Sequence, residues 1–337
     1  MENLHSGKQS IVFPNRPVLA FGASVVGKKE GEGPLGGCFD VVNPDTKFGE
    51  KSWERAESRM QRMALDTVLA KAKPQDSSPD LVFSGDLLNQ CVGSSFALRG
   101  LGIPSLGLYG ACSTMAEALL LAGCAVNAGY VTHAVALSSS HFAAAERQYR
   151  FPLGYGGQRT PTSQWTVTGA GAALVQPDGN GPALTCATVG CVTDYGVKDA
   201  NNMGAAMAPA AYETIRAHFA DLGRSPGDYD CIVTGDLGSL GKALLLELFA
   251  RDGVDLSGLC ADCGELIFDP QVQDVHCGGS GCGCSAVVLC GHFLDKLRSG
   301  ALKRLLFCGT GALLSPVSTQ QGAPVPAICH AVALETD

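Results

Sequence analysis

The sequence predicts a layered α/β protein built from two duplicated halves, and two observations support this prediction. Apolar runs typical of buried strands alternate with segments of helical periodicity, an order typical of mostly parallel sheets with helical crossovers. The same order of elements then recurs after residues 177–181, the strongest linker signal in the chain. We therefore place the first half at residues 1–177 and the second half at residues 178–337.

Each element of the first half follows from a local pattern. Apolar runs predict strands at residues 80–85, 105–109, 131–137 and 165–175. Ser52 is the expected N-cap of a helix that ends at about Lys73, because apolar residues recur there at helical spacing. Residues 110–114 are expected to turn sharply from a strand into an apolar helix that ends near Gly129.

The elements of the second half repeat that order. Strands are expected at residues 184–192, 229–237, 302–308 and 327–334, and helices at residues 209–222 and 281–300. Pro209 is expected in the first turn of its helix, with Gly223 just after the last turn. The clearest repeat joins residues 80–87 to residues 230–237, since both read Asp, an apolar run, a hydroxyl residue, Gly, Asp and Leu.

The composition excludes several classes of protein. Of the 337 residues, 17% are charged and 46% are hydrophobic, which excludes a disordered chain. The 43 glycines have no strict period, which excludes a fibre, and the net charge of −8 lacks the basic footprint of a nucleic-acid-binding protein. The 15 cysteines lie mostly among small apolar residues and are expected to be buried thiols in a reducing compartment.

No targeting or membrane-spanning segment is expected from the sequence. Residues 1–14 lack the pattern of a signal peptide, and no apolar stretch reaches about 18 residues without interruption. We therefore expect a protein that is soluble by its own means and that associates with a membrane only through partners.

The turn at Gly110-Ala111-Cys112-Ser113-Thr114 resembles the nucleophile turn of the thiolase-like superfamily, which includes thiolases and ketoacyl synthases. A closer resemblance is to its non-enzymatic branch, the stage V sporulation protein AD family. The matching segments cover nearly the whole chain and lie at residues 84–90, 109–114, 139–150, 154–158, 203–211, 278–282 and 309–316. The resemblance implies an αβαβα layered fold.

The same resemblance implies a function. Members of this branch are expected to bind dipicolinic acid (pyridine-2,6-dicarboxylate) and its calcium chelate, and to help load that compound into the developing spore. It further implies membrane-protein partners from the same sporulation operon, a peripheral location at the inner spore membrane and no cofactor. We also expect a homodimer.

Cys112 is the one cysteine whose position in the sequence, at the expected start of a helix, suggests a functional role. A thiol at a helix N-terminus has a lowered pKa and can take an acyl group, as the resembling condensing enzymes do. Those enzymes also carry a histidine at the position of residues 235–239, and an asparagine or second histidine in the turn at residues 278–285; this chain has neither, and His276 only precedes the turn. We therefore expect site lining without catalysis, while packing alone and an acyltransferase or thioesterase-like role for Cys112 stay open.

Cationic and hydroxyl groups are what a planar dicarboxylate needs. His141 and Ser140 follow a predicted strand, at the edge where open α/β sheets bind ligands. Arg147 and Arg150 follow on a short helix, three residues apart, and are expected to share a face. The alternatives are a hydrogen-bonded loop histidine and ordinary surface salt bridges.

Acidic and small polar residues complete the candidate set. Asp86 and Asp236 end the two duplicated strands, where each could cap the following helix, orient a donor or offer an oxygen to calcium. Asn89 and Ser280 lie in segments that carry the resemblance and are included as ligand-binding candidates.

A second group of cysteines has the spacing of a metal or redox site. Cys260 and Cys263 form a C-x-x-C pair, and His276, Cys277, Cys282 and Cys284 follow within 25 residues. The later part of the group falls in the glycine-rich turn that the duplication already explains. We therefore expect no metal site, and the role of Cys260 and Cys263 stays open.

Overall fold

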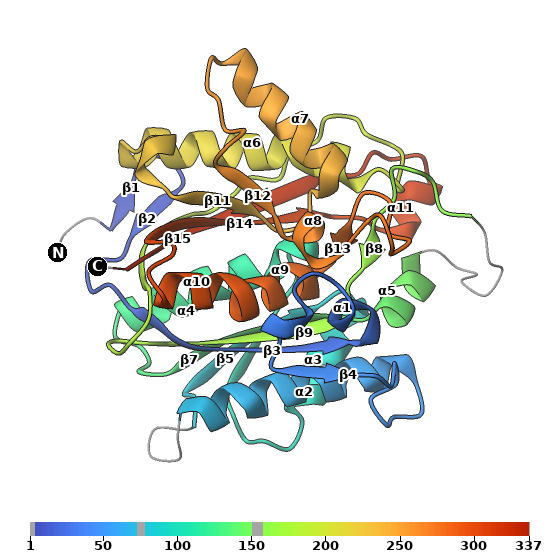
Figure 1. The fold of residues 1–337 in the computed structure, drawn as a ribbon. Helices are drawn as coiled ribbons and strands as arrows, with labels where there is room; N and C mark the ends of the chain where they lie inside the picture. Colours follow the sequence, from blue (N-terminus) through green and yellow to red (C-terminus); the bar gives the residue numbers. More distant parts are fainter. Residues whose placement is uncertain (1–3, 73–77, 150–157, 337) are drawn as a thin grey trace.

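The computed structural model describes residues 4–72, 78–149 and 158–336, and it has five layers (Figure 1). One outer layer holds α2 (Trp53–Ala72) and α3 (Val92–Leu98), and the opposite one holds α6 (Met203–Leu222) and α7 (Gly238–Arg251). Two sheets lie inside these helices, and a central helical layer separates the sheets. This is the αβαβα arrangement that the sequence predicted.

The central layer contains one helical segment from each half. The first is α4 (Thr114–Asn127). The second runs from α9 (Cys282–Val288) through a π-helical turn (Leu289–Phe293) into α10 (Leu294–Arg298), where the sequence predicted one unbroken helix. α4 and α9 are largely buried, and a single hydrophobic core fills the space between the sheets. α10 buries Leu294 and Leu297 and exposes Asp295, Lys296 and Arg298.

The first sheet has the strand order β6-β5-β7-β9-β3. Its strands are β3 (Val18–Gly27), β5 (Leu81–Asp86), β6 (Ser105–Leu108), β7 (Ala134–Ser140) and β9 (Gly169–Gln176). β5 is parallel to β6 and β7, while β9 is antiparallel to β7 and β3. Every residue of β7 is buried, as expected for a strand covered on both faces.

The second sheet repeats this pattern with the order β12-β11-β14-β15-β10, and one residue pair between β10 and β3, Ala183 with Val18, joins the two sheets at their edges. Its strands are β10 (Ala183–Thr188), β11 (Cys231–Thr234), β12 (Cys260–Asp262), β14 (Arg304–Ala312) and β15 (Ala327–Glu335). β11 is parallel to β12 and β14, while β15 is antiparallel to β14 and β10. The duplicated halves are thus confirmed by topology; the boundary between residues 177 and 178 stays a prediction.

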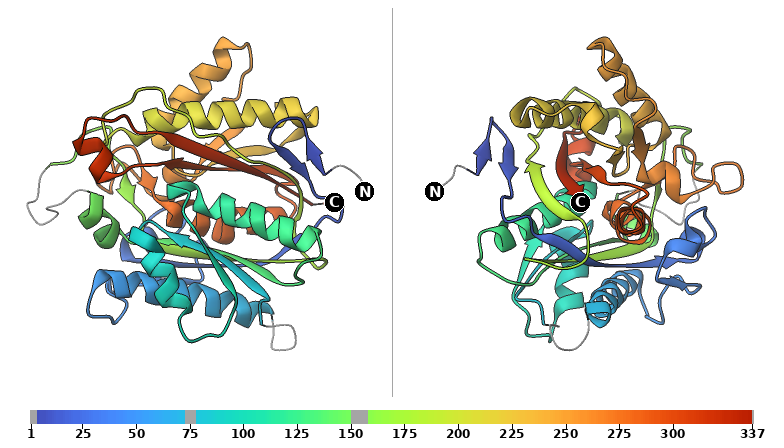
Figure 2. Two further views of the ribbon diagram at one scale, coloured as in Figure 1. Left: turned by 180° about the vertical axis from the view of Figure 1, so that it is seen from behind. Right: turned by 60° about the vertical axis from the view of Figure 1, so that its left-hand side comes forward.

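Shorter elements complete the fold. β1 (His5–Ser6) and β2 (Ser10–Val12) extend the second sheet, because β2 pairs with β10. Near the first sheet lie α1 (Lys28–Gly31), β4 (Val41–Asn43) and α5 (Phe142–Tyr149). The others are β8 (Trp165–Thr166), α8 (Cys263–Ile267), β13 (Gly279–Ser280) and α11 (Pro316–Gln320). β1 and the end of β15 lie at the same end of the molecule (Figure 2).

Several elements differ from their predicted bounds: β10 and β11 end earlier than expected, β14 ends later, and three further differences have a visible cause. α6 begins at Met203 rather than Pro209, because the Asn202 side chain accepts a hydrogen bond from the Ala205 amide and caps the helix six residues earlier. The strand expected at residues 165–175 is divided, since β8 pairs with β13 in a separate two-stranded sheet. β7 starts at Ala134 and continues to Ser140, because the serine hydroxyls there find buried acceptors.

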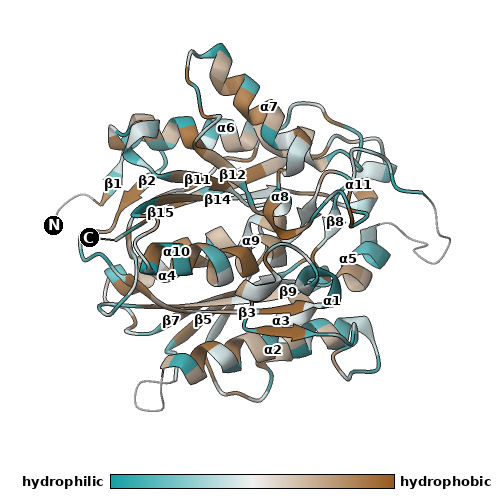
Figure 3. Cartoon of the chain, viewed as in Figure 1, coloured by the Kyte–Doolittle hydropathy of each residue, from teal (hydrophilic) through white to brown (hydrophobic). Residues whose placement is uncertain are grey.

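The hydropathy of the chain follows the layers (Figure 3). Hydrophobic residues gather on the strands and on the helical faces turned toward them, and the exposed sides of the outer helices are more polar. Within the three described segments, no helix combines the length and the apolar character needed to cross a membrane.

Candidate functional site

Cys112 lies in a short 3-10 turn, Ala111–Ser113, that leads from β6 into α4. Two hydroxyl groups hold this turn: Ser113 Oγ donates to the Gly110 carbonyl at 2.7 Å, and Thr114 Oγ1 donates to the Ala111 carbonyl at 2.7 Å. Ala111 has a φ of 49°, in the left-handed region that L-residues rarely adopt. The sharp strand-to-helix turn predicted from the sequence is therefore present.

A small cavity opens beside this turn. Its volume is about 40 Å³, and its walls come from both halves of the molecule. The described residues that line it are Leu87, Ala111, Cys112, Glu146, Tyr149, Thr166, Met203, Ser280, Ala312 and Leu314. Of the nine residues predicted for the site, the structure thus brings Cys112 and Ser280 to this cavity.

Asp236 lies directly behind Cys112 and joins the two halves. Its fully buried carboxyl group accepts hydrogen bonds from the Gly281 amide at 2.9 Å, from Thr310 Oγ1 at 2.8 Å and from the Cys112 thiol. The start of α7 is capped by Asp262 instead, which accepts from the amides of Leu237 and Gly238. The amides at the start of α7 are therefore bound by Asp262 rather than by Asp236, whose carboxyl group accepts from Gly281 and Thr310; the offer of an oxygen to calcium stays a prediction.

Burial controls the charges at this turn. Desolvation raises the pKa of the Asp236 carboxyl to about 7. Desolvation, followed by the nearby Asp236 charge, raises the pKa of the Cys112 thiol well above its ordinary value. The sequence-based expectation of a lowered thiol pKa at a helix N-terminus is corrected here, because burial and a carboxylate neighbour outweigh the helix dipole. The thiol is protonated at neutral pH.

Asp86, the counterpart of Asp236 in the first half, caps a helix. Its carboxylate accepts from the Ser94 amide at 2.7 Å and from Ser94 Oγ at 2.6 Å, inside the first turn of α3. It also accepts from the Leu88 amide at 2.9 Å. The two aspartates therefore end equivalent strands but have different partners.

His141 and Ser140 lie beneath the site surface rather than on the cavity wall. His141 is 2% exposed, its Nε2 is 2.7 Å from the Thr46 carbonyl oxygen, and burial lowers the pKa of its ring. Ser140 Oγ donates to the Val167 carbonyl at 2.7 Å. The His141 ring is neutral and the Ser140 hydroxyl is already hydrogen-bonded, so both residues serve to pack and position the neighbouring backbone.

Arg147 and Asn89 line a different groove, about 290 Å³ in volume, with Glu54 and Gln148. Arg147 pairs with the Glu54 carboxylate of α2. Arg150 lies outside the described residues. Arg147 therefore does not line the cavity beside Cys112, which α5 contacts through Glu146 and Tyr149, and ligand binding by Arg147 stays a prediction.

Sequence reasoning missed these two cavity residues of α5, Glu146 and Tyr149. Thr166 Oγ1 donates to Glu146 Oε1 at 2.8 Å. Tyr149 donates to the Leu87 carbonyl at 2.8 Å, and its hydroxyl oxygen also lies 2.7 Å from that of Tyr109. They are three residues apart and share a face with Ala145, so the apolar face of this helix was the signal that could have found them.

The second group of cysteines is buried for the most part, and all 15 thiols are free. Cys282 donates to the Ser139 carbonyl at 2.9 Å, so it packs at the floor of the same site. In the part of the chain that the structure describes, no three His, Cys, Asp or Glu side chains are arranged to hold a metal ion.

Comparison with known proteins gives both a family and a fold. The chain matches the family model described as stage V sporulation protein AD over residues 7–335. A protein of Bacillus subtilis (strain 168) with that same name is 43% identical over 330 residues, which is 98% of this chain and 97% of that protein.

Solved structures with a similar fold are condensing enzymes. Xanthomonas campestris OleA superposes with a TM-score of 0.61 at 13% identity, covering 96% of this chain and 98% of that chain. The 3-oxoacyl-[acyl-carrier-protein] synthase III of Aquifex aeolicus VF5 gives a TM-score of 0.55 at 12% identity, with 95% and 100% coverage. The priming β-ketosynthase of the R1128 polyketide pathway gives 0.58 at 16% identity, with 99% and 98% coverage. At these identities the likeness shows the thiolase-like fold alone.

Proposed function

Because the chain belongs to the stage V sporulation protein AD family, and so to a family of sporulation proteins, we propose that it binds dipicolinic acid as its calcium chelate, without catalysis. The ligand would be taken up into the developing spore, alongside membrane proteins of the same sporulation operon at the inner spore membrane. The binding site would be the cavity beside Cys112. The observation that carries this choice is the charge of the cavity wall.

The wall favours the chelate over the free dicarboxylate. Glu146 lines the cavity, Asp236 lies behind it, and none of the described lining residues is cationic. A dianion would be repelled by these carboxyl groups, whereas a calcium ion between ligand and protein is attracted. Calcium takes six to eight oxygen ligands, so the chelate can accept oxygens from Glu146, Ser280 and Thr166.

The rest of the wall suits the pyridine ring. Tyr149, Leu87 and Leu314 provide aromatic and aliphatic surface. A volume of about 40 Å³ is far below the roughly 300–1,000 Å³ of ordinary ligand pockets. Binding therefore requires lining side chains such as Tyr149 and Met203 to move apart.

The surroundings of Cys112 argue against catalysis. The thiolate is the nucleophilic form of cysteine, and burial, followed by the neighbouring Asp236 carboxyl group, raises the pKa of the Cys112 thiol well above its ordinary value. Asp236 lies in the stretch where the resembling condensing enzymes carry a histidine. The fold and the thiol favour an acyltransferase or thioesterase-like enzyme as the alternative function.

Calorimetry with dipicolinate, with and without calcium, tests the proposal. We expect the wild type to bind the chelate at least tenfold more tightly than free dipicolinate. Glu146→Gln should lose most of that preference, because the amide removes the charge that attracts calcium but keeps the shape. The control Glu247→Gln, on the exposed face of α7, should bind as the wild type does.

Two outcomes would reject this proposal. Absence of any heat at millimolar chelate would remove the binding function. Rapid formation of an acyl-enzyme on Cys112 with acyl-CoA, detected by mass spectrometry and absent in Cys112→Ala, would support the enzymatic alternative.

We also propose that two copies of the chain associate through β6. This strand ends the first sheet, and Leu106 is 52% exposed on it. An unpaired edge of this kind can pair with another strand. Pairing of β6 with β6 of a second copy across a twofold axis would join the first sheets of the two copies into one continuous sheet. Tyr109, just past the strand, contacts Tyr149 of the cavity, so the dimer would lie near the site.

Light scattering after size exclusion tests the association. The wild type should have twice the chain mass of 34.8 kDa, and Leu106→Lys should shift it toward that of one chain. Val317→Lys, at a 64% exposed position in α11, serves as the matched control and should stay dimeric. A monomeric wild type at micromolar concentration would disprove this interface.

A further inference from the structure

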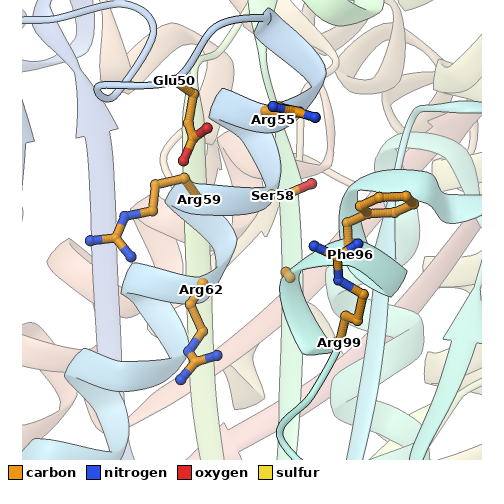
Figure 4. Close-up of a pocket in the computed structure, with 8 residues that line it drawn as sticks. Glu50, Arg55, Ser58, Arg59, Arg62, Phe96 and Arg99 are labelled. Atoms are coloured by element: carbon orange, nitrogen blue, oxygen red, sulfur yellow. The ribbon is translucent and has the colours of Figure 1, made fainter.

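A groove between α2 and α3 collects arginine side chains on the outer face of the first sheet (Figure 4). Its volume is about 350 Å³, within the range of small-molecule sites. Arg55, Arg59 and Arg62 come from α2, and Phe96 and Arg99 come from α3 on the other side. None of the residues that line this groove belongs to the cavity beside Cys112.

The charge of this groove is opposite to that of the molecule. Four guanidinium groups face one lining carboxylate, that of Glu50, in a chain whose net charge is −8. Arg62 pairs with Asp66 at 2.8 Å, and the Arg99 guanidinium lies 4.9 Å from the Phe96 ring centroid. Arg55 and Arg59 form no ion pair with any residue that the structure describes. At least two cationic groups are therefore available to a ligand.

The spacing of the arginines suits an extended anion. Arg55, Arg59 and Arg62 follow at i, i+4 and i+7, so they lie on one side of α2 over about 10 Å of helix length. A single phosphate group would contact only part of this row, whereas two neighbouring phosphates can each meet an arginine of successive turns. Ser58 lies between them on the same wall, and its hydroxyl donates to the Glu54 carbonyl at 3.1 Å.

We propose that this groove binds a ligand with two or more phosphate groups. The planar guanidinium fork matches phosphate oxygens with paired hydrogen bonds, and arginine is the preferred residue for such recognition. A row of them accommodates neighbouring phosphates along one ligand. The ligand can be a soluble compound with two phosphate groups or a lipid whose headgroup carries two phosphates, such as cardiolipin, since both present neighbouring phosphate oxygens.

Calorimetry with inorganic pyrophosphate tests the groove directly. We expect the wild type to bind pyrophosphate, with weaker binding at higher salt because the contacts are exposed ion pairs. The double variant Arg55→Ala/Arg59→Ala should bind at least tenfold more weakly. These two side chains have no carboxylate partner among the described residues, so the variant should keep the wild-type melting temperature. Arg251→Ala, an equally exposed arginine of α7, is the control.

Co-sedimentation with vesicles distinguishes the two sources of phosphate. Binding to vesicles of phosphatidylcholine with cardiolipin, but not to phosphatidylcholine alone, assigns the groove to a lipid headgroup if the double variant loses it. Pyrophosphate binding without vesicle binding assigns it to a soluble ligand. If the wild type binds neither probe, or the double variant binds both as the wild type does, the proposal is wrong.

Discussion

Replacement of Gly311 by alanine is expected to destabilise the protein by about 3 kcal/mol and to displace the Cys112 turn. Gly311 lies in β14, which is paired on both sides, with β11 and β15. A methyl group on Gly311 would lie 2.4 Å from the Gly110 carbonyl oxygen and 3.0 Å from the Ser113 amide nitrogen. Both are backbone atoms of the turn, so the added methyl group can be accommodated only if the backbone of the strand or of the turn moves, which costs free energy.

Urea denaturation at neutral pH measures this effect, and binding of calcium dipicolinate reports the displaced turn. Gly258→Ala is the matched control, because its added methyl group would meet no atom within 4 Å. Gly311→Ala with wild-type stability and wild-type binding would show that the contact between β14 and the turn is not rigid.

The duplicated fold could be predicted because its strands are buried on both faces. Such strands read as continuous apolar runs, and the two closest copies, at residues 80–87 and 230–237, became β5 and β11 at equivalent places in the two sheets. Strand ends were harder to predict. In the sequence, Ser138 and Ser139 are typical of a loop after the strand. In the structure both belong to β7, and each hydroxyl donates to a buried acceptor on a neighbouring element.

The residues of the cavity wall were hard to predict, because they depend on which face of the short helix α5 turns toward the cavity. The sequence shows Glu146, Arg147 and Tyr149 within four positions, and the chemistry of a dicarboxylate ligand favoured the arginine. A rotation of about 100° per residue places adjacent residues on different faces. Packing of Ala145 and Tyr149 against Leu87 and Cys112 turned Glu146 inward and left Arg147 to pair with α2.

The pKa of Cys112 could not be predicted from its own turn. The local sequence shows a helix N-terminus, which lowers the pKa of a thiol. Burial in the folded protein raises the pKa most, and the second cause is the carboxyl group of Asp236, 124 positions later in the chain. Asp236 reaches the thiol only because the duplicated halves place both strand ends beside the central helices. Long-range neighbours of this kind are set by topology.

Asp236 is expected to give the protein a distinctive pH dependence. Its pKa is about 7 in the folded state and 3.8 as the ordinary value, so the folded protein holds a proton that the unfolded chain has released between these two values. The stability that this proton contributes is fully present below pH 3.8 and is lost as the pH rises through about 7. The loss is about 1.4 kcal/mol for each pH unit in that window.

The variant Asp236→Asn isolates this contribution. An amide has the shape of the protonated carboxyl group and does not titrate. The free energies of unfolding of wild type and variant should therefore be most similar at acidic pH. From pH 5 to pH 8 the free energy of unfolding of the wild type should fall by about 3 kcal/mol relative to the variant. The nearby carboxyl group of Asp262, whose pKa is raised to about 6, titrates in both proteins and largely cancels in this difference.

Urea denaturation of both proteins at pH 5, 6, 7 and 8 gives the measurement. Asp255→Asn is the control: that carboxylate is exposed, hydrogen bonds to the Ser257 backbone lower its pKa, and its variant should show no such divergence above pH 5. Parallel stability curves for wild type and Asp236→Asn would mean that Asp236 is ionised throughout. An ionised Asp236 would place a full negative charge behind the cavity at every pH tested. With a pKa of about 7, Asp236 becomes negatively charged only near pH 7. Because that charge attracts calcium, calcium dipicolinate should bind more tightly at pH 8 than at pH 6.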